Sequence, residues 1–171
     1  MTRLFALDRN FPQPIVDVLA DFQADAKLVS LDAIDPRLST LDDWELLLAL
    51  HHHEEPWDGL ITTDSSMLAQ GPELAALIQT KLTLVVTMES GHNPVKASGL
   101  LFAYLAGICQ RTTPEQAQVW RLNAANRTHE KPWDLLVRFA AHNGREANDL
   151  WAEVRLRPAA LAHDPLAEPS S

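Results

Sequence analysis

Short apolar runs of strand length alternate with stretches of helical periodicity along the first two thirds of the chain. The strand-like runs fall at residues 3–8, 27–31, 59–63 and 82–88. Between them, apolar side chains recur three and four positions apart, which is typical of amphipathic helices. Strands that alternate with helices indicate a parallel or mainly parallel sheet with helices on both faces.

The expected helices begin at polar or proline residues that suit a helix start. Ser39 or Thr40 is expected to cap one of them, and Thr113 followed by Pro114 another. The predicted helices cover about residues 15–22, 41–53, 66–80 with a break near Gly71, 95–110, 113–126, 133–142 and 146–154.

The fold class that follows is α/β, a three-layer sandwich with a mainly parallel central sheet of about four to five strands and additional C-terminal helices. We expect a single domain over residues 1–157, with its C-terminal helical part at about 113–157. The Ala-, Pro- and Ser-rich residues 158–171 are predicted to form a flexible tail.

Length and composition fit one domain with a real core, because the chain has 171 residues of which 46% are hydrophobic. Cys109 is the one cysteine, which excludes an internal disulfide framework and favours a reducing compartment. No apolar run approaches the roughly 18 residues that span a bilayer, and the N-terminus has no signal pattern. We therefore expect a soluble, cytoplasmic protein that does not bind a membrane.

The net charge of −9 is unevenly spread along the chain. Residues 1–90 hold fifteen acidic and five basic residues, whereas residues 91–171 hold eight acidic and nine basic ones. A protein that binds nucleic acid mainly through phosphate charge should be basic, which argues against non-specific DNA binding. The distribution allows an acidic metal site in the first half, and ordinary surface charge for solubility is the alternative.

Two aspartates follow directly on two of the strand-like runs. Asp8 closes the run at 3–8, and Asp64 follows the run at 59–63. The carboxyl ends of parallel strands line the ligand crevice of an open α/β sheet, so these two acids are expected to lie close together. Paired carboxylates suit Mg²⁺ or Mn²⁺, and such an ion can activate water and hold a phosphodiester. For either residue singly, a turn or helix-capping role is the alternative.

The helix that is expected between these two strands supplies further carboxylates. Asp43 lies at the margin of its apolar stripe and is predicted to point along the sheet edge, so it completes the predicted catalytic and metal-binding set. Asp42 and Glu45 are expected to be more exposed and to support the site, as are Asn10 and Ser66, which follow the strand-terminal aspartates by two residues. Stabilisation of the helix dipole is the alternative role for Asp42 and Asp43.

Three motifs, in this order, resemble the PIN-like superfamily, and within it the toxin-type (VapC-type) proteins whose first motif reads Asp-x-Asn-hydrophobic-Pro. They are Leu7-Asp8-Arg9-Asn10-Phe11-Pro12, the acidic helix start around Asp43, and Leu60-Ile61-Thr62-Thr63-Asp64-Ser65-Ser66-Met67. The resemblance covers about residues 3–110. It implies a metal-dependent ribonuclease that uses Mg²⁺ or Mn²⁺, often the toxin of a toxin–antitoxin pair, with RNA as substrate and an antitoxin as partner. A homodimer is a separate expectation about the assembly.

One departure from the family pattern keeps other interpretations open. PIN-like nucleases usually carry a fourth acidic or amide residue shortly after the third acid, where this chain has Ser65 and Ser66. A catalytically weak or inactive PIN-like binding or regulatory module is therefore the alternative. A receiver-like domain that is phosphorylated on an aspartate is a third, but Asp8 has no acidic neighbour and Lys96 is poorly placed for it.

Overall fold

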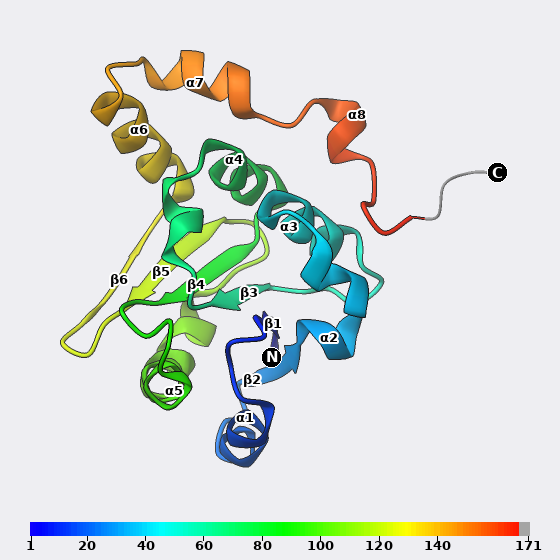
Figure 1. The fold of residues 1–171 in the computed structure, drawn as a ribbon, viewed down its shortest axis with the longest axis vertical. Helices are drawn as coiled ribbons and strands as arrows, with labels where there is room; N and C mark the ends of the chain where they lie inside the picture. The colour runs from blue at the N-terminus through cyan, green and yellow to red at the C-terminus, as the bar shows by residue number, and fades with distance from the viewer. Residues whose placement is uncertain (168–171) are drawn as a thin grey trace.

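A six-stranded sheet forms the centre of the computed structural model, which describes residues 1–167 (Figure 1). The strand order is β2-β1-β3-β4-β5-β6, with β1 to β5 parallel to their neighbours and β6 antiparallel to β5. The strands are β1 Arg3–Leu7, β2 Ala26–Ser30, β3 Gly59–Thr62, β4 Thr83–Thr87, β5 Gln118–Leu122 and β6 Arg127–Glu130. The predicted α/β class with a mainly parallel sheet is confirmed, and the sheet has six strands rather than four to five.

Helices cover both faces of this sheet (Figure 1). On one face lie α1 (Gln13–Ala20) and α5 (Pro94–Arg111). The opposite face carries α3 (Asp43–His52), α4 (Gly71–Thr80), α6 (Pro132–His142) and α7 (Ala147–Val154). The remaining short elements are α2 (Leu31–Ile34), α8 (Pro158–Leu161) and two 3₁₀ helices, η1 (Pro36–Thr40) and η2 (Ser65–Ala69).

Each face of the sheet builds its own hydrophobic core. Along β4, Leu84 and Val86 pack with Leu47 of α3, whereas Val85 between them packs with Leu101 of α5. This alternation follows from the two-residue period of a strand. All five residues of β4 are buried, which explains why its sequence is an unbroken apolar and threonine run.

The helix that the sequence predicts over 113–126 is absent, and this prediction is wrong. The segment instead holds β5 and the turn into β6, where the Asn123 amide donates to the Asn126 carbonyl. Val119 packs on one face of the sheet and Trp120 on the other, which is the alternation of a strand. The pairing with β4 therefore overrides the helix-start signal at Thr113, and the C-terminal helical part begins at Pro132.

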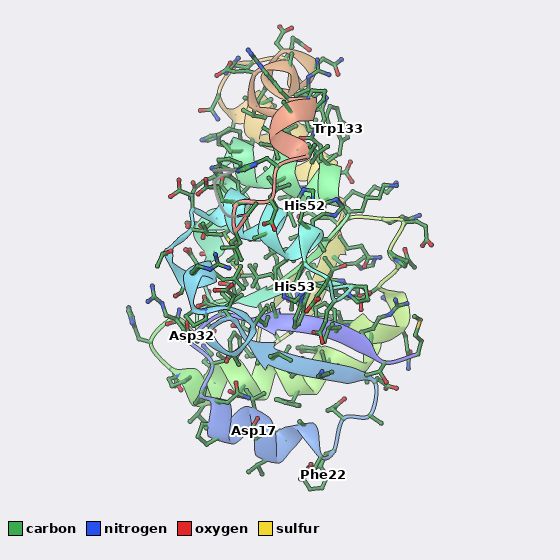
Figure 2. All side chains as sticks on the ribbon, turned by 90° about the vertical axis from the view of Figure 1, so that its right-hand side faces the viewer. Asp17, Phe22, Asp32, His52, His53 and Trp133 are labelled. Atoms are coloured by element: carbon green, nitrogen blue, oxygen red, sulfur yellow. The ribbon has the colours of Figure 1, made fainter. Side chains whose placement is uncertain are left out.

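The chain after α7 runs back over the α3 and α4 layer, and we call residues 155–167 the C-terminal segment. Gln79 of α4 binds the backbone of Leu156 twice, with Nε2 donating to its carbonyl at 3.0 Å and Oε1 accepting from its amide at 2.7 Å. Farther along, Nε2 of His52, which Figure 2 labels, donates to the carbonyl of Leu161, the last residue of α8, at 2.8 Å. The sequence predicts a flexible tail over 158–171, whereas residues 158–167 include a helix; residues 168–171 lie outside the described part.

None of the helices within residues 1–167 combines the length and the apolar character needed to cross a membrane.

Candidate functional site

Strands β1 and β3 are neighbours at the centre of the sheet, although β2 lies between them in the chain. The chain passes from β1 to β2 on one side of β1 and then crosses to β3 on the other side of β1. The boundary between β1 and β3 is therefore the topological switch point of the sheet. Ligands of open α/β sheets bind beyond the carboxyl ends of the strands at such a point. Asp8 extends the pairing there, because its amide donates to the Ile61 carbonyl at 2.9 Å. Asp64 follows two residues after the end of β3.

A cavity of about 200 Å³ lies at this edge of the sheet. Asp8, Asp43 and Asp64 all line it, so the structure brings together the three acids that the sequence selects. Asn10 lines it as well. The other lining residues are Arg9, Leu31, Leu38, Ser39, Leu41, Leu46, Leu60, Thr62 and Met67.

Thr62 joins two of these acids through its hydroxyl group. Its Oγ1 donates to Oδ2 of Asp8 at 2.8 Å and accepts a hydrogen bond from the Asp64 amide at 3.0 Å. Thr62 itself is only 2% exposed, whereas Asp8 is half-buried and Asp64 is exposed, so both bonds are partly buried. Sequence reasoning did not select Thr62, although the Thr-Thr-Asp sequence at the end of an apolar run contains the signal.

Asn10 holds the other side of Asp8. Its Nδ2 donates to Oγ1 of Thr63 at 3.0 Å and to Oδ2 of Asp8 at 3.4 Å. Asp64 is fixed by the start of η2, where its Oδ1 accepts from the Ser66 amide at 2.8 Å. Backbone and side-chain donors therefore hold both strand-terminal carboxylates in place.

Asp43, like Asp8, is half-buried in the cavity lining. Burial raises the pKa of its carboxyl group, and the negative charges of Asp64, Asp8 and Asp42 raise that pKa further. Like charges that act on one another across a small cavity disfavour the ionised state. A cation in the cavity would relieve this repulsion.

The remaining predicted site residues lie outside the cavity lining. Asp42 is the N-cap of α3, and its amide donates to Oε2 of Glu45 at 3.2 Å, so these two acids serve the helix start. Ser39 and Thr40 are not caps of α3, because their hydroxyls donate to carbonyls within η1. Ser66 is exposed, and its Oγ accepts a long 3.4 Å bond from Gln70.

The donor types of the cavity suit Mg²⁺ or Mn²⁺, since carboxylate and amide oxygens are the ligands that these hard ions prefer. Within residues 1–167, however, no group of three or more His, Cys, Asp or Glu side chains is arranged to hold a metal ion. Mg²⁺ commonly keeps several waters and contacts only one or two carboxylates, a mode that needs no such preformed cluster. The donor types of the cavity therefore suit a divalent ion that contacts only one or two of its carboxylates.

Two other groups of residues, the histidines at 51–53 and the arginines of β5 and α6, contact other parts of the protein. Of the three consecutive histidines at 51–53, His51 and His52 contact each other ring edge to ring face. His52 also binds the Leu161 carbonyl, and His53 packs edge-on against Trp57 (Figure 2). Arg121 and Arg138 both form ion pairs with Glu130, at 2.7 and 2.6 Å. Neither group adds a ligand to the acidic cavity.

Comparison with known proteins finds no matching family model, no matching curated protein and no matching solved structure. The functional argument therefore depends on the motifs and on the geometry of the cavity.

Proposed function

We propose that this chain is a PIN-like, metal-dependent ribonuclease that hydrolyses RNA phosphodiesters with Mg²⁺ or Mn²⁺. One observation carries the proposal: Asp8, Asp43 and Asp64 come from three different elements and line one cavity at the switch point of the sheet. Convergence of separate acids at that position is what the resemblance to PIN-like proteins implies.

The ion would bind among the three acids, in direct contact with one or two of their carboxylates, and the neighbouring side chains would hold the acids. Thr62 fixes the distance between the Asp8 carboxylate and the backbone at Asp64, and Asn10 steadies Asp8 from the other side. A bound divalent ion supplies Lewis acidity, which activates water and offsets negative charge on a phosphodiester. Arg9, an exposed cation in the cavity lining, would be available to contact a substrate phosphate.

The toxin role, an antitoxin partner, a homodimer and a cytoplasmic location also belong to the proposal. The resemblance of the motifs around Asp8 and Asp64 to toxin-type PIN-like proteins supports the toxin role and the antitoxin partner, and the one cysteine, Cys109, supports the cytoplasmic location.

A non-catalytic PIN-like binding or regulatory module is the second candidate. The observation that favours it is that Ser66, at the position of the usual fourth acid, is exposed and lies outside the cavity lining. A site with fewer carboxylates binds a divalent ion more weakly. In this candidate, the cavity binds an ion or a partner without cleaving RNA.

A receiver-like function receives less support from the structure. The order of the parallel strands suits a receiver domain, but a fold alone does not define an activity. The lysine that such a mechanism needs would be Lys96, which donates to the Glu89 carbonyl at 3.0 Å and does not line the cavity.

The test is cleavage of a single-stranded RNA by the full chain with Mn²⁺, compared with the variant Asp8→Asn. We expect metal-dependent cleavage by the natural chain and a loss of at least about a hundredfold in the variant, because the ion loses a charged ligand. The matched control is Asp17→Asn, an exposed aspartate on α1 that lies outside the cavity lining and should retain full activity (Figure 2).

The outcomes separate the candidates. Binding of Mn²⁺ by calorimetry without any RNA cleavage would favour the non-catalytic module. A natural chain that neither binds Mn²⁺ nor cleaves RNA would refute the metal-dependent proposal.

A further inference from the structure

A buried carboxylate that takes no part in the proposed ligand set lies on α4, the helix that packs against α3. Glu73 belongs to the first turn of α4, and its side chain is only 5% exposed. Within the described part of the chain, its Oε2 atom is buried and has no hydrogen-bond partner. Burying a carboxylate oxygen without a hydrogen-bond partner is costly, so the surroundings of Oε2 call for an explanation.

The charged groups that act on Glu73 are the acids at the start of α3. Helix α3 packs directly against α4, which places Glu73 within electrostatic reach of Asp43 and Asp42. Burial raises the pKa of Glu73 and these two carboxylates raise it further, while its own backbone amide acts in the opposite direction. The surroundings of Glu73 are therefore negative on the side of the cavity.

The opposite side of the α4 N-terminus is closed by α7. A methyl group added at Gly71 would come within 2.8 Å of Val154 Cγ1, so this helix start is packed against an aliphatic side chain. The helix dipole of α4 and the Glu73 backbone amide both favour a carboxylate in this first turn, but Oε2 keeps no hydrogen-bond partner in this packed region.

We propose that Glu73 is a positioning residue for a divalent cation in the cavity, acting through Asp43 by adding negative charge behind it. This inference rests on the proposed metal-dependent function. Glu73 does not line the cavity and is not proposed as a ligand. Its charge strengthens the attraction of the cavity for a cation, and the cation in turn offsets the cost of keeping Glu73 buried.

The test compares the variant Glu73→Gln with the natural chain, using Mn²⁺ alone as the probe. Isothermal titration measures the affinity for Mn²⁺, and thermal denaturation is recorded without and with the metal. Because glutamine has the same shape without the charge, we expect a higher melting temperature of the metal-free protein and a roughly three- to tenfold weaker affinity for Mn²⁺. The matched control is Glu54→Gln, which removes an exposed charge after the far end of α3 and should change neither quantity.

Several outcomes would overturn the inference. If Glu73 only supports the start of α4, Glu73→Gln lowers the melting temperature and leaves the Mn²⁺ affinity unchanged. If Glu73→Gln does not fold, the variant Glu73→Asp is used instead, because it keeps the negative charge. We then expect an affinity for Mn²⁺ within about twofold of that of the natural chain. A larger loss of affinity contradicts the role of the charge.

The failure of this inference can be distinguished from the failure of the proposed function. A chain that binds Mn²⁺, loses that binding in Asp8→Asn and keeps it in Glu73→Gln retains the metal site and refutes only the role of Glu73. A natural chain that does not bind Mn²⁺ refutes both.

Discussion

Replacing Thr62 by valine tests the arrangement of the cavity most directly. The substitution keeps the shape of the side chain but removes the hydroxyl that joins Asp8 to the backbone of Asp64. A hydrogen bond to a charged group contributes about 1.5–3 kcal/mol, and one to a neutral amide about 1 kcal/mol. The added methyl group returns about 0.8 kcal/mol of apolar burial. We therefore expect Thr62→Val to lower the free energy of unfolding by about 2 kcal/mol.

A loss of this size should lower the melting temperature by roughly 4–8 °C in a chain of this length. The assay is thermal and urea denaturation of the metal-free protein, followed by circular dichroism. Thr62→Ser is the matched control, because it keeps the hydroxyl and should retain most of the stability. The reasoning would be refuted if Thr62→Val were as stable as the natural chain, or if Thr62→Ser lost as much stability as Thr62→Val.

Three further predictions follow from the same structure. Asp43→Asn should raise the melting temperature near neutral pH by about 2–4 °C, because the raised pKa of Asp43 means that its ionised form destabilises the folded state. This gain should disappear as the pH falls below 3.8, the ordinary pKa of the group, and a series of melting curves at different pH values will check it. Ser66→Asp should change the Mn²⁺ affinity measured by calorimetry by less than about twofold, because Ser66 is exposed and does not line the cavity. Gln79→Ala should lower the free energy of unfolding by about 2 kcal/mol and speed amide hydrogen exchange at Leu156, because it removes both side-chain hydrogen bonds to the Leu156 backbone. The control Gln70→Ala should change neither quantity.

The convergence of the acids was predictable because it depends on local features of the chain. Asp8 and Asp64 each follow a short apolar run that forms a parallel strand, and the carboxyl ends of parallel strands share one edge. Asp43 could be selected from the margin of an apolar helical stripe. These inferences need strand direction and helix periodicity, and both are visible in the sequence.

The features that were not predicted depend on contacts between distant parts of the chain. Strand β5 pairs with β4, and without that partner the segment starting at Thr113 and Pro114 has the features of a helix start. The role of Thr62 depends on the register of β1 and β3, which places its hydroxyl against Asp8. Glu73 looks like an ordinary acid in the first turn of a helix, and only the packing of α3 and α4 shows that it is buried.

The electrostatics of this region oppose folding. Asp8, Asp43 and Asp64 share a cavity in which Arg9 is the one basic residue among those described, and Glu73 is buried without a hydrogen-bond partner for Oε2. Each of these features violates a rule that favours stability, and such violations concentrate at functional sites. A surface role would leave the acids dispersed and hydrated, whereas binding of a divalent cation gains from their concentration. The cost in stability therefore has a physical explanation if the cavity binds a cation, and the Glu73→Gln and Asp43→Asn variants measure that cost directly.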